Sequence, residues 1–136
     1  MRSAFTLVEI LIVVIILGIL AALVVPSMVN AADDAAETAT YTELGKLRRA
    51  VDAYRARENS LPDVTGGDGT WGGLVSSEYL KSPPINAWVG RTNGSVIVLG
   101  DTPDGGFQST HGWIYDPATG QIWAGAHDDL DAPYTK

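Results

Sequence analysis

Residues 5–25 of this chain read FTLVEILIVVIILGILAALVV, and only Thr6 and Glu9 among them are polar. A helix of this length rises roughly 30 Å, which matches the hydrocarbon core of a membrane. The abundant Ile and Val do not argue against a helix, because a segment in lipid must satisfy its backbone hydrogen bonds internally. The stretch therefore predicts a transmembrane helix close to the N-terminus.

Glu9 is the one acidic residue of this stretch. A carboxylate in a membrane costs on the order of a few kcal/mol at the centre and less near the interface, so it usually has a partner. One interpretation is a single-pass anchor that leaves Glu9 at the level of the lipid headgroups. The other interpretation gives Glu9 a cationic partner.

The residues before the apolar stretch point to such a cation. A secretory signal peptide is cut after its apolar run, which is then lost, but the residues that follow Ala21-Ala22 stay apolar. Cleavage between Ala4 and Phe5 would instead keep the run. It would also create an α-amine, with a pKa of about 8, four residues before Glu9.

The segment Phe5-Thr6-Leu7-Val8-Glu9, the apolar run, Gly18 and Pro26 together resemble the N-terminus of type IV pilins and of type II secretion pseudopilins. The resemblance implies assembly into a helical filament whose core is made of the apolar helices. It also implies that the stretch from Gly18 to Pro26 becomes extended in the filaments of some members. Gly and Pro weaken a helix, which is consistent with that behaviour.

The same resemblance assigns the processing site. It implies cleavage after Ala4 by a prepilin peptidase, N-methylation of Phe5, and pairing of Glu9 with the amine of a neighbouring copy. Family members usually carry Gly before the cut, and this chain carries Ala4, which is small enough that we expect cleavage. Further partners implied are minor pilins or pseudopilins, an inner-membrane assembly platform, and membrane lipid before assembly.

Composition limits the remaining function classes. A chain of 136 residues with 46% hydrophobic content suggests one domain plus its anchor. It has no cysteine, so neither a disulfide nor a thiol nucleophile is available. The net charge of −7 argues against nucleic acid as a partner. Arg2 before the span favours a cytoplasmic N-terminus in the bacterial inner membrane, with a periplasmic or extracellular filament after assembly.

An amphipathic helix is predicted to follow the membrane span. Leu44, Leu47, Val51 and Tyr54 recur at spacings of three and four, which gives an apolar stripe to hold a head. The sequence Asn59-Ser60-Leu61-Pro62 predicts the end of this helix. Acidic residues come first along it and basic residues follow, so charge pairs between staggered copies are expected to guide their register; a plain solvated face is the alternative.

The rest of the chain predicts a small sheet. Residues 95–100 form an apolar run, and residues 112–116 and 120–124 flank a turn that ends in Gly120, as in a β-hairpin with a positive φ. The aromatic side chains of this hairpin are expected to pack against the helix. A sugar-binding platform of exposed tryptophans is the alternative.

Two parts of the connector are similar to the major type II pseudopilins, although more loosely than the N-terminus. Residues 54–62 resemble their helix exit, and residues 79–88 resemble the segment that leads to a Pro-Trp-Gly corner. In this chain Ala87 replaces the Pro, and Val89 intervenes before Gly90.

Two acidic clusters are candidate calcium sites, namely Asp101 with Asp104, and Asp128 with Asp129 and Asp131. Calcium takes six to eight oxygen ligands, which adjacent acidic loops can supply. Major pseudopilins bind calcium in a C-terminal acidic loop, but this sequence does not reproduce the spacing of that loop. The alternative is a solubilising acidic surface, and no other cofactor is expected.

No catalytic motif is present. His111 and His127 lie in separate segments without a metal-ligand spacing, and we expect both at the surface or in loops. The Gly-rich residues 63–70 lack the Gly-Lys-Ser/Thr ending of a phosphate-binding loop. The chain is therefore not expected to be an enzyme.

Together these observations predict an α+β fold in which a long N-terminal α-helix, half membrane-spanning and half amphipathic, packs against a small antiparallel β-sheet head. The expected function is that of a type II secretion pseudopilin that assembles into a filament to drive protein export. The alternatives are a surface pilin for adhesion, motility or DNA uptake, and a membrane-anchored carbohydrate- or ligand-binding module. The predicted divisions are a leader at 1–4, a membrane or filament-core helix at 5–26, a stalk helix at 27–61, a connector at 62–94, and a sheet with an acidic tail at 95–136.

Overall fold

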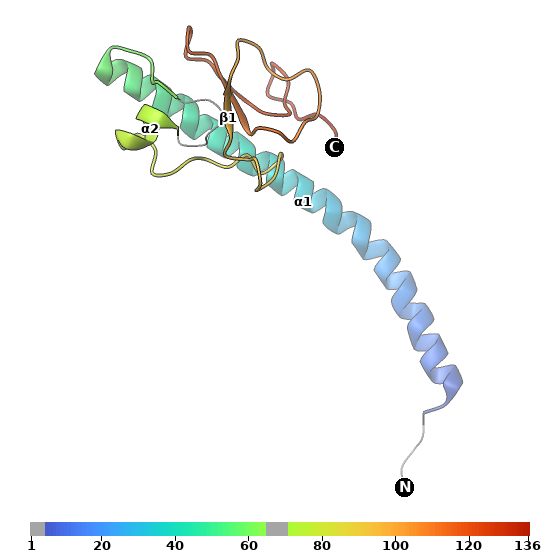
Figure 1. Ribbon diagram of the computed structural model, residues 1–136. Coiled ribbons are helices and arrows are strands. Elements are labelled where there is room, and N and C mark those ends of the chain that lie inside the picture. The colour runs from blue at the N-terminus through green and yellow to red at the C-terminus, as the bar shows by residue number, and fades with distance from the viewer. Residues whose placement is uncertain (1–4, 65–70) are drawn as a thin grey trace. The chain divides into compact units, whose positions relative to one another are not determined.

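The computed structural model describes residues 5–64 and 71–136, with the backbone alone for residues 25–27 (Figure 1). The predicted cleavage residue Ala4 lies outside the described residues. The chain divides into two compact units, Met1–Asp34 and Ala35–Lys136, and each is described by itself.

The first unit contains the start of helix α1, Leu7–Glu58. By length and composition α1 can cross a membrane, and it is the one described helix that can. Its apolar side chains are exposed all along the first unit, from Leu7 and Val8 to Leu23 and Val24. So large an exposed apolar surface on a single copy marks contact with lipid or with other protein chains.

In the second unit, α1 supplies one wall of the hydrophobic core. Leu44, Leu47 and Val51 are buried and Tyr54 packs partly buried beside them, which confirms the predicted apolar stripe. The helix ends at Glu58, and Asn59 takes a left-handed φ of 51°. Asn tolerates this conformation at helix ends, and the predicted exit is confirmed.

Three short strands supply the opposite wall: β1, Ile97–Leu99; β2, Trp113–Tyr115; and β3, Ile122–Ala124. They form one sheet in the order β1-β2-β3. A short helix, α2, Gly72–Ser76, packs Leu74 into the same core. Figure 1 shows the sheet and α2 beside the C-terminal half of α1.

The sheet is mixed, and the prediction of antiparallel pairing holds for one of its two strand pairs. Strands β2 and β3 are antiparallel, with Ile114 opposite Trp123, and Gly120 in the turn has φ 79° as expected. Strand β1, however, runs parallel to β2. The reason is the length of the connection: residues 100–112 form a crossover long enough to return the chain to the same end of the sheet, which parallel pairing requires.

Of the hairpin aromatics, Trp113 and Tyr115 pack into the core as predicted, whereas Trp123 is half-buried and lies outside the core cluster. Trp71, Trp113 and Tyr115 are fully buried, and the rings of Trp71 and Trp113 meet edge to face with centroids 6.2 Å apart. None of the four tryptophans is exposed. The tryptophans therefore form no exposed platform for a sugar.

Both histidines were expected at the surface or in loops; His127 lies outside the helices and strands, in the segment after β3, but it is buried, with a relative exposure of 0%. Its ring packs edge to face against Tyr41 and Trp88, and Nδ1 lies 2.9 Å from the carbonyl oxygen of Gly125. Nothing in the local sequence signals this burial, because the two rings that cover His127 come from distant parts of the chain.

Candidate assembly site

Thr6 and Glu9 close the N-terminus of α1 with reciprocal hydrogen bonds. The backbone N–H and the hydroxyl of Thr6 donate to Glu9 Oε2 over 2.8 and 2.9 Å, and the N–H of Glu9 donates to the Thr6 hydroxyl over 3.2 Å. This is a capping box, which satisfies two backbone donors that a helix start otherwise leaves open. The capping box was not predicted, although the Thr-x-x-Glu spacing of Thr6 and Glu9 is its signal in the sequence.

The other predicted assembly residues lie along the same unit. Phe5 precedes the helix and is exposed. A side chain at Gly18 would meet open space. Helix α1 continues through Pro26, so in a single copy the segment from Gly18 to Pro26 is helical. The extended form expected in a filament stays a prediction.

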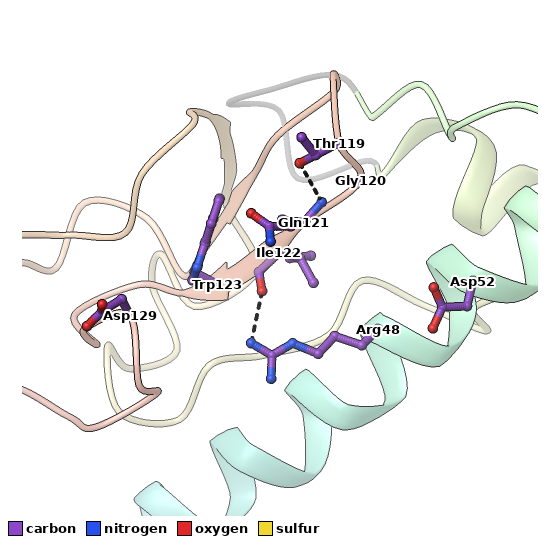
Figure 2. Close-up of a pocket in the computed structure, with 8 residues that line it drawn as sticks. All are labelled: Arg48, Asp52, Thr119, Gly120, Gln121, Ile122, Trp123 and Asp129. Atoms are coloured by element: carbon purple, nitrogen blue, oxygen red, sulfur yellow. Dashed lines mark hydrogen bonds between the residues drawn. The ribbon is translucent and has the colours of Figure 1, made fainter.

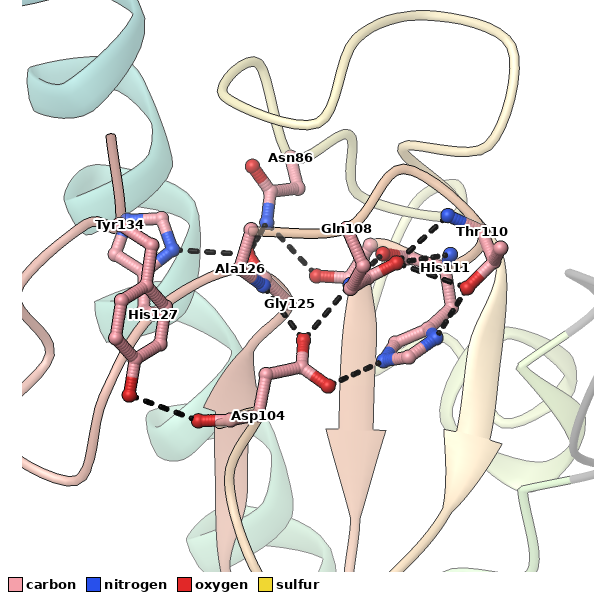
Figure 3. A network of polar contacts seen from close by, with 10 residues as sticks. Asn86, Asp104, Gln108, Thr110, His111, Gly125, Ala126, His127 and Tyr134 are labelled. Carbon is pink, nitrogen blue, oxygen red and sulfur yellow. Dashed lines mark hydrogen bonds and ion pairs between the residues drawn. The ribbon is translucent and has the colours of Figure 1, made fainter. Parts of the chain in front are cut away.

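Asn86 is the polar centre of the second unit (Figure 3). Its buried amide nitrogen donates to the carbonyls of Gly112 and Gly125 over 2.9 and 3.0 Å. Its amide oxygen accepts from the backbone N–H groups of Trp88 and Val89 and from the hydroxyl of Thr40 on α1; these distances are 2.9, 3.2 and 3.2 Å. One side chain thus joins α1, the connector and the sheet.

Asp104 fastens the crossover between β1 and β2 to the C-terminal segment (Figure 3). Its carboxylate accepts from the backbone N–H of Ala126 over 2.7 Å and from the amide of Gln108 over 2.8 Å. The other carboxylate oxygen lies 3.3 Å from Nε2 of His111. The hydroxyl of Tyr134 donates to the carbonyl of Asp104 over 3.0 Å.

The three aspartates of the second acidic cluster have different partners. Asp131 makes a bidentate ion pair with Arg48 of α1 at 2.7 and 2.8 Å. Asp128 accepts the backbone N–H groups of Leu130 and Ala132. Asp129 helps to line a shallow pocket in which Arg48 also reaches the carbonyl of Ile122 (Figure 2).

The predicted calcium ligands therefore do not converge. In residues 5–64 and 71–136, no three or more His, Asp or Glu side chains are grouped so that they would hold a metal ion. The carboxylate of Asp104 accepts a backbone hydrogen bond, the carboxylate of Asp131 pairs with Arg48, and Asp101 is exposed in a loop. Calcium binding by these residues stays a prediction.

Replacing Arg48 with Gln should lower the free energy of unfolding of the second unit by about 1 kcal/mol, because a bidentate pair of partly exposed charges is lost. Salt screens exposed charges, so the difference from the native chain should shrink at 1 M salt. Thermal unfolding followed by near-ultraviolet circular dichroism measures both. The exposed Arg55, replaced with Gln, is the control and should change little. Equal effects of the two variants would contradict the assignment.

Burial raises the pKa of Tyr115 to about 12, with Asp116 adding a repulsive charge. The carboxylate of Asp116 itself accepts from the hydroxyl of Thr119 and the N–H of Ala118, and these bonds lower its pKa. Both residues stand at the β2–β3 turn. In the described residues the hydroxyl of Tyr115 has no hydrogen-bond partner.

The Tyr115 pKa predicts alkaline unfolding. A raised pKa contributes stability that is fully present below the unfolded value of about 10 and is lost as the pH rises toward 12. Replacing Tyr115 with Phe should change little at pH 7, because an unpartnered hydroxyl is removed, and should lessen the loss of Tm between pH 10 and 12. Melting curves at pH 7, 10 and 11.5 test this, and parallel losses in the two proteins would refute it.

Known proteins resemble this chain in sequence, both at the N-terminus and along most of its length. A family model described as the prokaryotic N-terminal methylation motif matches residues 1–25. Type II secretion system core protein G of Klebsiella michiganensis is 36% identical over 133 residues, which cover 94% of this chain and 89% of that protein.

Two further relatives carry the same name. The protein of Pseudomonas aeruginosa is 33% identical over 100 residues, covering 64% of this chain and 68% of the relative. For Pectobacterium carotovorum the identity is 36% over 85 residues, and the match spans about half of the relative, 53%, and 62% of this chain. No solved structure matches significantly. By its N-terminal motif and its match along nearly its whole length, the chain belongs to the family of type II secretion system core protein G, the major pseudopilins.

Proposed function

We propose that this chain is the structural subunit of a type II secretion pseudopilus, in which copies polymerise through their apolar N-terminal helices to drive protein export. The observation that carries the proposal is the exposed apolar surface along residues 7–24 of α1, with the carboxylate of Glu9 in the first turn of the helix. Membrane lipid covers this surface before assembly, and the same surface of other copies covers it in the filament.

Glu9 sets the register of this assembly. After cleavage at Ala4, the methylated amine of Phe5 is a buried cation that needs a partner, because an unpaired charge in an apolar filament core is costly. Glu9 holds its Oε2 in the capping box, and a carboxylate has further lone pairs that can accept from a neighbouring copy. A neighbouring copy shifted along the filament axis to any other register would leave the carboxylate of Glu9 and the amine of Phe5 unpaired.

The proposed partners follow from the same arrangement. A prepilin peptidase cuts after Ala4 and an inner-membrane platform receives the processed chain, together with minor pseudopilins. The N-terminus is cytoplasmic before assembly and the filament is periplasmic. The role is structural, and no catalytic step is assigned to the chain.

The test of processing is the intact mass of the protein purified from its native membrane. We expect a chain that begins at Phe5 and carries one added methyl group. A full-length chain from Met1 would remove the amine partner of Glu9 and overturn the proposal.

The test of register is the replacement of Glu9 with Gln. Gln can keep the capping box with Thr6 but has no charge, so the helix should persist while assembly falls by about tenfold or more. Sheared filaments are counted, and far-ultraviolet circular dichroism reports the helix. The matched control is Thr6 replaced with Ser, which keeps both the cap and the charge. Normal filament yield from the Gln variant would refute the role of Glu9.

A further inference from the structure

One flank of α1 carries a basic groove. Lys46 and Arg49 of α1 and Lys81 of the connector stand along it, and Ala53, Tyr79 and Leu80 are among the residues that complete its lining. Although the whole chain carries a net charge of −7, no carboxylate lines this groove. In the described part of the chain, Lys46 pairs with Glu43, whereas Arg49 and Lys81 make no ion pair.

On the other side of α1, the chain presents an apolar side chain on an acidic loop. Residues 128–132, called here the Leu130 loop, expose Leu130 to 83%. Three aspartates surround this leucine, at positions 128, 129 and 131. A single exposed leucine needs no explanation by itself. Its combination with neighbouring carboxylates, however, complements the basic and apolar lining of the groove.

The Leu130 loop is held in one conformation. A β-bridge between His127 and Pro133 closes its base, and the N–H of Asp128 donates to the carbonyl of Ala132 over 2.9 Å. Asp131 has a left-handed φ of 64°, a conformation that Asp tolerates better than most residues. Its bidentate pair with Arg48 ties the loop to α1. Leu130 is therefore presented outward on a preorganised loop, which lowers the entropic cost of docking.

A single copy cannot bring the two surfaces together. Lys46 and Ala53 are seven residues apart and share one flank of α1, whereas Arg48, two residues from Lys46, projects from nearly the opposite flank. The loop that Arg48 anchors and the basic groove thus lie on different sides of α1. Two complementary patches on different faces of one molecule make a heterologous contact, which adds copies without closing.

We propose that the Leu130 loop of one copy docks into the basic groove of the next copy along the filament. Leu130 covers the apolar lining near Ala53 and Leu80, while Asp129 meets the charges of Arg49 and Lys81. This inference rests on the proposed function, since it describes a contact between heads within the pseudopilus. The charges steer and orient the contact, and the leucine provides the buried apolar area.

The absence of cysteine from the chain makes disulfide cross-linking a clean test. In filaments of a variant with Leu130→Cys and Ala53→Cys, we expect oxidation to give a ladder of linked copies. The matched control combines Ala53→Cys with Leu99→Cys, another exposed apolar position (54%) outside the loop, and should give no ladder. Filaments that form without a ladder would overturn this inference alone. Failure of the native chain to form filaments beside its secretion machinery would overturn the proposed function as well.

A charge exchange tests the same contact without cysteines. Lys81→Glu should lower the yield of sheared filaments by about tenfold, and Asp129→Lys in the same chain should restore most of it, because the pair is then reversed. Restoration of this kind requires direct proximity between copies. Equal loss in the single and double variants would refute the docking.

Discussion

Replacing Asn86 with Leu should lower the free energy of unfolding of residues 35–136 by about 3–5 kcal/mol, a fall in Tm of about 15–30 °C. Leu has the same number of side-chain heavy atoms as Asn and the same branch at Cγ, so it resembles Asn in shape, with bulkier methyl groups, while the hydrogen bonds are lost. The carbonyls of Gly112 and Gly125 and the N–H groups of Trp88 and Val89 are then left inside the core with fewer partners. Each buried polar group left unsatisfied costs roughly 1–3 kcal/mol.

The measurement is thermal unfolding of the full chain in detergent, followed by near-ultraviolet circular dichroism of the buried tryptophans. The control is Asn93 replaced with Leu, because Asn93 makes one exposed hydrogen bond, to the carbonyl of Ser109. We expect a change below about 1 kcal/mol for the control. If the two variants melt together, Asn86 is not the centre that joins α1 to the sheet.

The sequence predicted those features that depend on periodicity and composition. Residues 5–25 are apolar apart from Thr6 and Glu9, and in lipid a single segment satisfies its backbone hydrogen bonds as a helix. The spacing of Leu44, Leu47 and Val51 requires a helix with one buried face, and the structure confirms it. The turn before Gly120 predicted the β2–β3 hairpin for a similarly local reason.

Features that depend on distant partners were not predictable. A single Asn86 after two prolines looks like a turn residue, and nothing local indicates that it bonds to glycines 26 and 39 positions away. The direction of β1 depends on how residues 100–112 return, which a short apolar run does not encode. The aspartates suggested calcium because each lies within three residues of another aspartate in sequence, whereas Asp104 and Asp131 contact His111 and Arg48 in space.

The same distinction between local and distant features applies to the candidate functional residues. Phe5 and Glu9 could be proposed from the sequence because their motif is contiguous, and their roles in assembly stay predictions. The basic groove was not found, since it joins Lys46 and Arg49 to Lys81 across more than thirty positions of sequence. Its positive charge is also hidden in the overall composition, which is acidic.

Replacing Gly112 with Ala should destabilise the second unit by about 3–4 kcal/mol, a large effect for one methyl group. The new Cβ would collide with the backbone carbonyl of Gly94, and that backbone cannot yield freely. The carbonyl of Gly94 accepts from the N–H of Asn86 over 2.9 Å, and the N–H of Gly112 donates to Val96 over 2.9 Å.

Gly106 is the matched control for this substitution, because a Cβ there meets nothing within 4 Å. Its replacement with Ala should stay within about 1 kcal/mol of the native chain and can be slightly stabilising, since Ala restricts the unfolded chain. Gly112 also accepts the amide of Asn86, so the two sites share one network. We therefore expect Asn86→Leu combined with Gly112→Ala to cost less than the sum of the single changes, whereas strict additivity in the same melting experiment would show that backbone collision and hydrogen bonding act independently.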